Sequence, residues 1–220
     1  MTRTGYEVSA AAVGRYAPAV RPTGLVLGRN SDGTPALLRI FRPEPTRVTL
    51  LGGTWLAWLL VFRSFALGAR VLVRTGDPDR WQGLGEASTG AANRLRLVDE
   101  RPAAATIHAA APLLVVSDLD GNQADDLLPT TPWHTMLTVA AQLNDAAAAT
   151  LPTADAAIVQ RMWPQQAEYA ATAVGIDPDA VLPVRDMPDD VVAVLRPDGA
   201  VYVRLAPTAI ERRLFGPPRR

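Results

Sequence analysis

Short blocks of apolar and polar residues alternate along the chain and predict strands that alternate with helices. Two apolar runs enclose the polar residues 30–33, and two more enclose Pro197, Asp198 and Gly199. Glycine ends each polar stretch, where it tolerates the positive φ that a tight turn needs. The pattern therefore predicts one β-hairpin over residues 24–41 and a second over residues 191–205.

The segment 46–75 has the clearest pattern. Residues 46–51 are an apolar run with β-branched members, Gly52 and Gly53 turn the chain, and residues 54–67 stay apolar for the length of a helix. Gly68 ends that helix, and residues 69–75 form a second β-branched run. This order predicts a β-α-β unit with a right-handed crossover, whose helix is apolar on nearly every face and is therefore buried against a sheet.

The rest of the chain continues the alternation. Asp77 and Pro78 are expected to start a short helical region over 77–92, and residues 94–100 read as a strand with Leu95 and Leu97 on one face. Residues 113–118 and 134–142 predict two further strands, and residues 154–175 a helix that Pro164 kinks or divides. The predicted fold class is α/β, degenerate Rossmann-like, with a mainly parallel sheet and β-hairpins near both ends.

A length of 220 residues suits one domain with one core. We expect a loosely ordered lead-in over 1–22, a single α/β domain over 23–216 and a tail over 217–220. The most apolar stretch, 48–62, has 15 residues, fewer than the roughly 20 that a spanning helix needs, so the chain as given reads as soluble. Residues 211–220 combine apolar side chains with four arginines, which fits either a docking segment or a frayed end.

Composition excludes several kinds of chemistry. The 22 basic residues balance 22 acidic ones, so no net charge favours nucleic acid as a partner. All of the basic residues are arginines, which removes the lysine of a P-loop and the amine of a Schiff base. Cysteine is absent, which excludes thiol nucleophiles and cysteine-zinc sites. His108 and His134 are too few for a histidine-rich metal site and are expected to be structural.

The Gly52-Gly53 turn invites comparison with the dinucleotide-binding fingerprint. Gly52 fits its first glycine and Ala57 its third position, but Thr54 stands where the second glycine lets the backbone approach a pyrophosphate. Arg74 is placed to meet a 2′-phosphate. A plain strand-to-helix turn is the favoured interpretation, and a nucleotide- or dinucleotide-binding protein remains an alternative.

Asp118 and Asp120 follow a buried strand in the manner of haloacid-dehalogenase phosphatases, with Asp118 as the nucleophile. Asn122 replaces the usual threonine of that motif, and Asp125 and Asp126 complete a loop with four carboxylates. The loop could instead hold a divalent cation. A metal-dependent phosphatase or transferase is therefore a second alternative, although aspartates at strand ends are more often loop-forming groups.

The succession of elements over residues 23–100 resembles the cytosolic part of EccE, a component of type VII (ESX) secretion systems of actinobacteria. The resemblance rests on the hairpin GLVLGRNSDGTPALLRIF, the run TRVTLLGG, an apolar helix, GARVLVRT, DPDRWQGL and RLRLVDE. It implies a non-enzymatic interaction component with protein partners in a membrane secretion complex, located in the cytoplasm at the inner face of the membrane. It carries over no catalytic, cofactor-binding or metal-binding residue, and the two transmembrane helices of EccE have no counterpart in this sequence.

Overall fold

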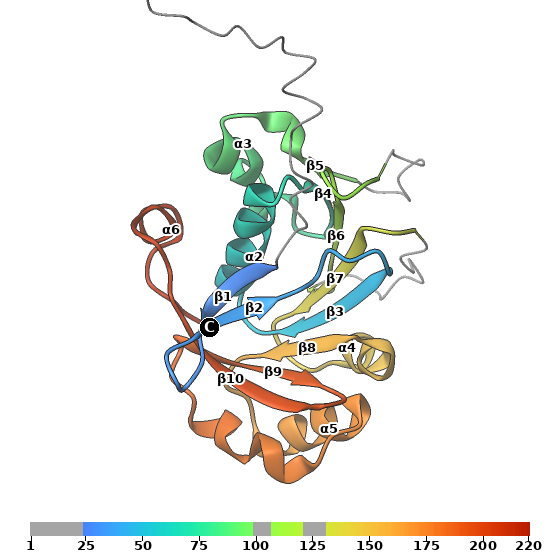
Figure 1. Cartoon of the computed structure of the whole chain (residues 1–220), viewed down its shortest axis with the longest axis vertical. Helices are drawn as coiled ribbons and strands as arrows, with labels where there is room; N and C mark the ends of the chain where they lie inside the picture. The colour runs from blue at the N-terminus through green and yellow to red at the C-terminus, as the bar shows by residue number, and fades with distance from the viewer. Residues whose placement is uncertain (1–23, 99–106, 121–130) are drawn as a thin grey trace, which may run out of the picture.

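The computed structural model describes residues 24–98, 107–120 and 131–220, and one ten-stranded sheet runs through them (Figure 1). Its strand order is β2-β1-β10-β9-β8-β3-β7-β6-β4-β5. The strands are β1 (Leu25–Arg29), β2 (Pro35–Leu38), β3 (Thr46–Leu51), β4 (Arg70–Arg74), β5 (Leu95–Leu97), β6 (Leu113–Asp118), β7 (His134–Ala140), β8 (Ala156–Val159), β9 (Val191–Arg196) and β10 (Gly199–Leu205).

The sheet has a parallel part and an antiparallel part. Strands β8, β3, β7, β6, β4 and β5 run parallel to one another. Both predicted hairpins are present as β1–β2 and β9–β10, and they pair with each other through β1 and β10 and with the parallel part through β9 and β8. The predicted α/β fold with a mainly parallel sheet is confirmed.

The predicted strand-helix-strand order over 46–75 is also present, but its two strands are not neighbours. Strands β7 and β6, which come later in the chain, lie between β3 and β4. The connection from β3 therefore runs toward β5, whereas the connection from β7 runs back past β3 to β8. Such a reversal is the place where open α/β sheets bind ligands, beyond the carboxyl ends of their strands.

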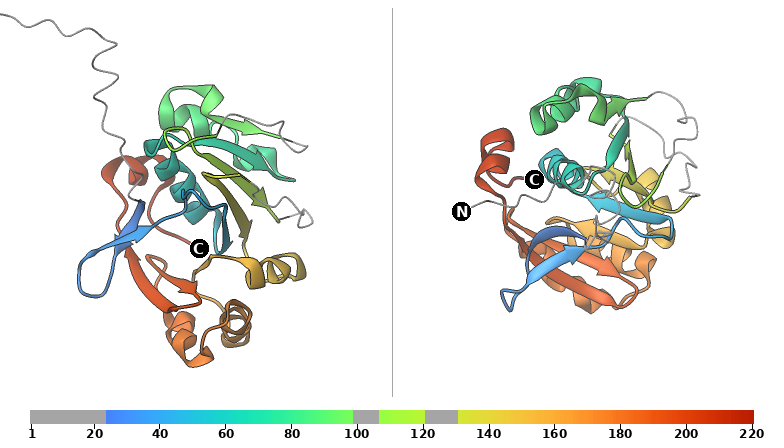
Figure 2. Two further views of the ribbon diagram at one scale, coloured as in Figure 1. Left: turned by 45° about the vertical axis from the view of Figure 1, so that its right-hand side comes forward. Right: turned by 45° about the horizontal axis from the view of Figure 1, so that its top comes forward.

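Helices cover both faces of the sheet (Figure 2). Helix α2 (Thr54–Ala66), α3 (Leu84–Thr89) and α6 (Ala209–Phe215) share one apolar cluster, and α4 (Asp145–Thr150), α5 (Pro164–Val174) and η4 (Pro178–Asp186) share another on the opposite side. The short 3₁₀ turns are η1 (Pro78–Arg80), η2 (Ala92–Arg94) and η3 (Leu151–Thr153).

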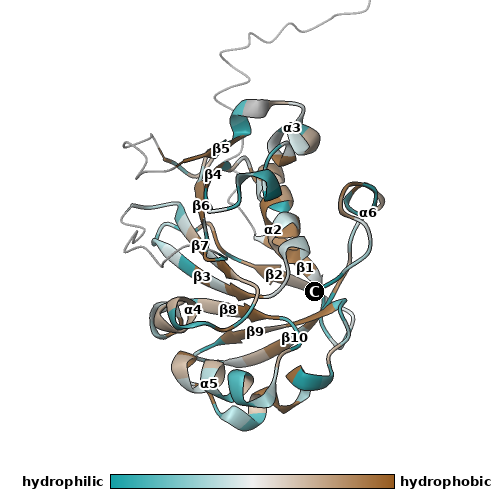
Figure 3. Ribbon diagram, turned by 180° about the vertical axis from the view of Figure 1, so that it is seen from behind, coloured by the Kyte–Doolittle hydropathy of each residue, from teal (hydrophilic) through white to brown (hydrophobic). Residues whose placement is uncertain are grey.

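Helix α2 is buried, as its apolar sequence predicts, because the sheet covers one side of it and α3 and α6 pack on another (Figure 3). Trp55, Leu56, Leu59 and Leu60 are each at most 1% exposed. Among the described residues, no helix has both the length and the apolar character that crossing a membrane requires.

The single helix predicted over 154–175 is wrong. Its first part is the strand β8, and α5 begins only at Pro164. The four residues of β8 are fully buried between β3 and β9. This burial compensates for the low strand propensity of its two alanines. Pro164 starts the helix and does not kink it, because an N–H in the first helical turn has no hydrogen-bond partner within the helix and its absence costs nothing.

Candidate functional site

A cleft of about 550 Å³ opens at the carboxyl edge of the parallel strands. The segments that follow β3, β4, β6 and β7 all contribute to it, because parallel strands end at the same edge of a sheet. The last residues of the chain close one side. The lining consists of Gly53, Thr54, Trp55, Trp58, Asp77, Arg80, Asp120, Ala141, Arg219 and Arg220.

The N-terminus of α2 faces this cleft. Only Gly52 and Gly53 separate it from β3, and Gly53 is its N-cap, so no side chain caps the first turn. The N–H groups of Gly52 and Gly53 are used, since they donate to the Ala140 carbonyl oxygen at 2.9 Å and to Gln160 Oε1 at 2.7 Å. In the following turn the N–H of Leu56 donates to the Gly53 carbonyl oxygen at 3.1 Å, so the N–H groups of Thr54 and Trp55 are the ones that could bind an anion, which the helix dipole also favours.

Both glycines are required by close packing around the turn. A Cβ on Gly52 would lie 2.6 Å from Gln160 Oε1, and a Cβ on Gly53 would lie 2.6 Å from the backbone carbon of Arg220. Gln160 follows β8 and is 1% exposed. The buried side-chain amide of Gln160 therefore holds the turn, and the end of the chain, which lies beside α2, contacts it as well (Figure 2).

Asp118, the last residue of β6, is fully buried at 0% exposure. Its carboxylate accepts hydrogen bonds from Thr75 Oγ1 at 2.9 Å, Trp81 Nε1 at 2.8 Å and Arg80 Nη1 at 3.2 Å. The N–H of Asp120 also donates to Asp118 Oδ1 at 3.3 Å. A carboxylate held by these four donors and closed to solvent is poorly placed to attack a phosphoester, so the structure does not favour Asp118 as a nucleophile.

Arg80 is the central cation of the cleft. Its Nη1 also donates to Asp120 Oδ2 at 2.9 Å, and its Nε lies 3.5 Å from Asp77 Oδ2. Partial burial alone would lower the pKa of the Arg80 guanidinium, but the nearby charges of Asp118 and Asp120 outweigh it and raise that pKa above its ordinary value. Arg80 therefore stays charged and links the segment that follows β4 to the carboxylates at the end of β6.

Arg219 and Arg220 also line the cleft, and the backbone of Arg220 lies against Gly53. Burial and then the neighbouring charge of Arg161 lower the pKa of Arg220, whereas Asp189 partly offsets this shift. A cation whose pKa is lowered in this way is destabilised as a charge. The charged groups that act on this guanidinium, Arg161 and Asp189, are not among the lining residues of the cleft.

The structure brings together some of the residues singled out from the sequence. Gly53, Thr54 and Asp120 line the cleft, and Gly52 lies in the turn below it. Arg74, expected to meet a phosphate, is the last residue of β4 and is not among the lining residues, whereas Arg80, six positions on, is.

The remaining candidate residues lie away from the cleft. Ala57 is buried inside α2, His134 begins β7 at the opposite edge of the sheet, and His108 takes part in an isolated bridge. Asn122, Asp125 and Asp126 lie outside the described residues. Within the described part of the chain, no group of three His, Cys, Asp or Glu residues is arranged to hold a metal ion.

Sequence reasoning missed Arg80, Gln160 and the two C-terminal arginines. A signal for Arg80 was present, because Asp77 and Pro78 start a helical turn directly after a strand and so place Arg80 at the carboxyl edge. Gln160 and Arg220 gave no such signal, since each reaches the turn from a distant part of the chain.

No protein-family model and no curated protein matches the chain, but solved structures do. The cytoplasmic domain of the type VII secretion ATPase EccC from Thermomonospora curvata is similar over 93% of this chain, with 14% identity and a TM-score of 0.57. The chain spans only 32% of that structure. VirB4 of Thermoanaerobacter pseudethanolicus has 9% identity and a TM-score of 0.55, covering 86% of this chain and 98% of VirB4.

The genome packaging NTPase B204 of Sulfolobus turreted icosahedral virus 2, solved in complex with ATP-gammaS, is also similar. It has 9% identity and a TM-score of 0.51, and the match covers 74% of this chain and 97% of B204.

These neighbours correct two expectations. The resemblance to EccE is wrong, and so is the expectation of a non-enzymatic component that rested on it, because the matching structures include a secretion ATPase and a packaging NTPase. The error arose because residues 23–100 contain only a hairpin and a strand-helix-strand order, which many α/β proteins share. The strands that complete the order, β6 to β10, come later in the chain. The chain has the α/β fold of these secretion and packaging ATPases.

Proposed function

We propose that the chain is a nucleotide-binding protein of the ATPase type that binds the phosphates of a nucleoside triphosphate in the carboxyl-edge cleft. One observation carries this proposal: the uncapped N-terminus of α2 faces a cleft that also contains Arg80, Arg219 and Arg220. Helix N-termini and guanidinium groups are both established binders of phosphate. In B204, which has the same fold, a nucleotide analogue is bound.

The missing lysine does not leave the cleft without positive charge. A P-loop lysine reaches the β- and γ-phosphates, and here the three arginines of the cleft would take over that role. Guanidinium groups present donors in a planar fork that matches phosphate oxygens. A volume of about 550 Å³ lies within the range of about 300–1,000 Å³ that is typical of small-molecule sites.

Asp120 fits the role of a carboxylate that shares a magnesium ion with the nucleotide. It is 26% exposed and lines the cleft, in contrast to the buried Asp118. Magnesium usually takes one or two carboxylates and completes its shell with phosphate oxygens and water, so a cluster of three acidic residues is not needed. The ion would neutralise charge on the phosphates.

The same geometry disfavours a dinucleotide site and a phosphatase. Thr54 stands at the start of α2 where a dinucleotide site needs glycine, and Arg74 lies outside the cleft. The burial of Asp118 argues against a phosphatase that would use it as a nucleophile.

We also propose, from the likeness to EccC, that the protein works with protein partners of a secretion apparatus on the cytoplasmic side of a membrane. The EccC structure is that of a cytoplasmic domain. That no nucleic acid binds stays a prediction from the balanced charge of the chain.

A thermal-shift panel tests the nucleotide proposal. ATP and ADP with magnesium should raise the melting temperature, and a ligand at a hundred times its Kd adds about 2.7 kcal/mol to the free energy of unfolding. AMP should act more weakly because it lacks the outer phosphates. Arg220→Gln should reduce the ATP shift, whereas Arg213→Gln, which changes an exposed arginine on α6 outside the cleft, should retain it. Unchanged melting with every nucleotide tested would contradict the proposal.

A further inference from the structure

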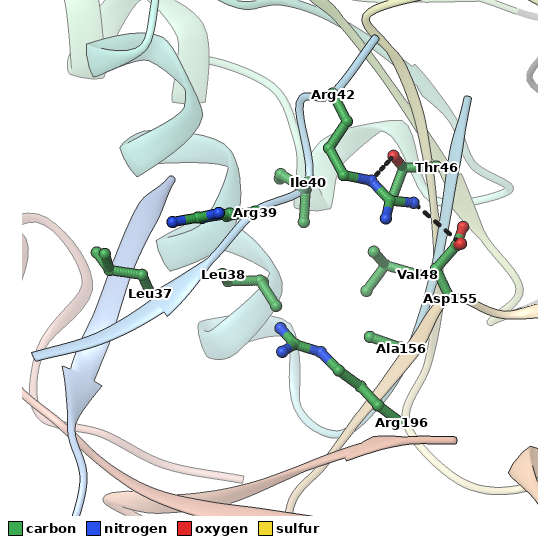
Figure 4. Close-up of a pocket in the computed structure, with 10 residues that line it drawn as sticks. All are labelled: Leu37, Leu38, Arg39, Ile40, Arg42, Thr46, Val48, Asp155, Ala156 and Arg196. Atoms are coloured by element: carbon green, nitrogen blue, oxygen red, sulfur yellow. Dashed lines mark hydrogen bonds and ion pairs between the residues drawn. The ribbon is translucent and has the colours of Figure 1, made fainter. Parts of the chain in front are cut away.

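A cavity of about 440 Å³ lies at the amino edge of the parallel strands, where Thr46 begins β3 and Ala156 begins β8 (Figure 4). The six residues of β3 separate it from the nucleotide cleft by roughly 20 Å, at about 3.3 Å per residue. Arg196, the last residue of β9, extends its side chain into this space toward Leu38 of β2 (Figure 4). We call this space the Arg196 cavity.

The guanidinium of Arg196 has no acidic partner. It makes no hydrogen bond or ion pair with any residue that the structure describes. Asp155 lines the same cavity, but its Oδ1 accepts from Arg42 Nη2 at 2.9 Å and its Oδ2 accepts from the backbone N–H of Arg47 at 2.7 Å. The residue opposite Arg196 on β10 is Gly199, which has no side chain to offer. The positive charge of Arg196 is therefore not neutralised within the cavity.

Arg39 adds no second charge to the cavity. Leu38 and Ile40 are buried on one face of their segment, whereas Arg39 is exposed on the other, and its guanidinium is turned away from Arg196 (Figure 4). Water solvates Arg39, but Arg196 is partly buried. A partly buried charge is costly unless it is paired, and an arginine cannot escape that cost by losing its proton. A single negative charge beside Arg196 would remove the cost.

Apolar space continues from Arg196 to the region beneath the β1–β2 hairpin. A smaller cavity of about 180 Å³, which we call the hairpin cavity, shares Leu37, Leu38 and Arg196 with the larger one. Arg196 therefore stands where the two cavities meet. Four aliphatic residues that line the hairpin cavity are at most 7% exposed, namely Leu27, Ala36, Val194 and Val203. Small-molecule sites typically combine such apolar walls with a few charged groups that fix orientation.

We propose that Arg196 binds the carboxylate of a small aliphatic monocarboxylic acid, whose hydrocarbon chain packs beneath the hairpin against Leu38, Val194 and Val203. A guanidinium fork matches the two oxygens of one carboxylate. One unpaired cation calls for a singly charged head, because a dianion would bring a negative charge that the cavity does not neutralise. This site is separate from the nucleotide cleft, and the proposal does not rest on nucleotide binding.

Titration calorimetry with octanoate, acetate and 1-octanol tests the match of head and chain. Octanoate should bind at one site per chain. Its affinity should exceed at least tenfold that of acetate, which lacks the chain, and that of 1-octanol, which lacks the charge. The absence of saturable heat with octanoate would overturn the proposal, and so would equal affinities for octanoate and 1-octanol.

Two variants with the same change of side chain test the role of Arg196. Arg196→Gln should weaken octanoate binding at least tenfold. Arg39→Gln removes the neighbouring exposed arginine and is the matched control, so it should bind octanoate as the wild type does. Circular dichroism of each variant shows whether the fold is kept. A folded Arg196→Gln protein with wild-type affinity, or equal losses in the two variants, would contradict the assignment.

Backbone amide chemical shifts locate the bound octanoate in the wild-type protein, which needs no variant to fold. Shifts should change at residues 36–38, 194–196 and 201–203, which surround the two cavities. Changes confined to residues 52–55 would place octanoate in the nucleotide cleft and would overturn the proposal.

Discussion

The buried carboxylate of Asp118 is the residue on which the architecture of the carboxyl edge depends. A charged group at 0% exposure is costly unless it is paired and hydrogen-bonded, and here Thr75, Arg80 and Trp81 meet that requirement. All three donors follow β4, whereas Asp118 ends β6. The carboxylate therefore fixes the segment that carries Arg80 and thereby positions the main cation of the cleft.

Replacing Trp81 by phenylalanine tests this role. Trp81→Phe keeps most of the buried aromatic surface but removes the Nε1–H that donates to Asp118 at 2.8 Å. A hydrogen bond to a charged group contributes about 1.5–3 kcal/mol, so the free energy of unfolding from urea titration should fall by that amount.

Trp163→Phe is the matched control for this substitution. Trp163 is 75% exposed, and surface changes usually stay within about 0.5 kcal/mol. Equal effects of the two substitutions would contradict a structural role for the bond between Trp81 and Asp118.

At this scale the sequence predicted the position of Asp118 but not its role. The apolar run before it placed the carboxylate at a strand end, as the structure shows. Its partners could not be predicted, because Arg80 lies 38 positions away in the chain and meets Asp118 only because β4 and β6 are neighbours. Strand adjacency of that kind is a property of the complete sheet.

A buried ion pair joins helix α6 to helix α2. Arg63 of α2 donates to both carboxylate oxygens of Glu211, at 2.7 and 2.9 Å, and also to the carbonyl oxygens of Leu27 and Ala206. Phe215, at the end of α6, packs against Trp58 and Phe62 of α2. Because α6 leads directly into the residues that cover the Gly53 turn, this pair also positions one wall of the cleft.

Arg63→Met should therefore be strongly destabilising. It leaves the Glu211 carboxylate, whose side chain is 2% exposed, buried without its partner. Removing one member of a buried pair costs about 3–5 kcal/mol, which urea denaturation would measure. Arg213→Met, on the exposed side of the same helix, should cost less than about 0.5 kcal/mol. A small effect at Arg63 would show that α6 is held mainly by its apolar contacts.

The same pair makes stability depend on pH. Burial alone would raise the pKa of Glu211, but the hydrogen bonds and charge of Arg63 and the N–H of Thr208 outweigh it and lower that pKa below its ordinary value of 4.5. A carboxyl with a lowered folded-state pKa stabilises the fold above its unfolded-state pKa, and this contribution is lost as pH falls through the folded-state value.

Glu211→Gln should therefore lose more stability at pH 7 than at pH 3. The difference in unfolding free energy between the wild type and this variant should shrink as pH falls below about 4.5. A difference that stays constant over this range would contradict the assigned shift.

At the scale of elements, periodicity and turn residues were enough for both hairpins, for α2 and for the strands β6 and β7. They failed for β8, which is four residues long and half alanine. Such a segment is a strand only because β3 and β9 flank it, and no local pattern contains that information.

The strand order of the whole molecule places the cleft at one edge of the sheet. The reversal of connections around β3 and β7 creates the cleft at the carboxyl edge. The attachment of the antiparallel strands to β8 extends the sheet on the other side of β3. The sequence predicted the α/β layers but not this strand order, because β6 and β7, which separate β3 from β4, come later in the chain. The position of the cleft therefore follows only from the strand order of the complete sheet.

Calorimetric titration of ATP with magnesium into the wild-type protein and into Arg220→Gln tests whether the carboxyl-edge cleft binds a nucleotide. We expect saturable binding of one ATP per chain, weakened at least about tenfold in the variant, because a lost hydrogen bond to a charged group is worth about 1.5–3 kcal/mol and about 1.4 kcal/mol corresponds to a factor of ten. Binding should also weaken as salt screens the charges of the cleft. No saturable heat with the wild type, or equal affinity in both proteins, would contradict the assignment of the carboxyl-edge cleft as a nucleotide site.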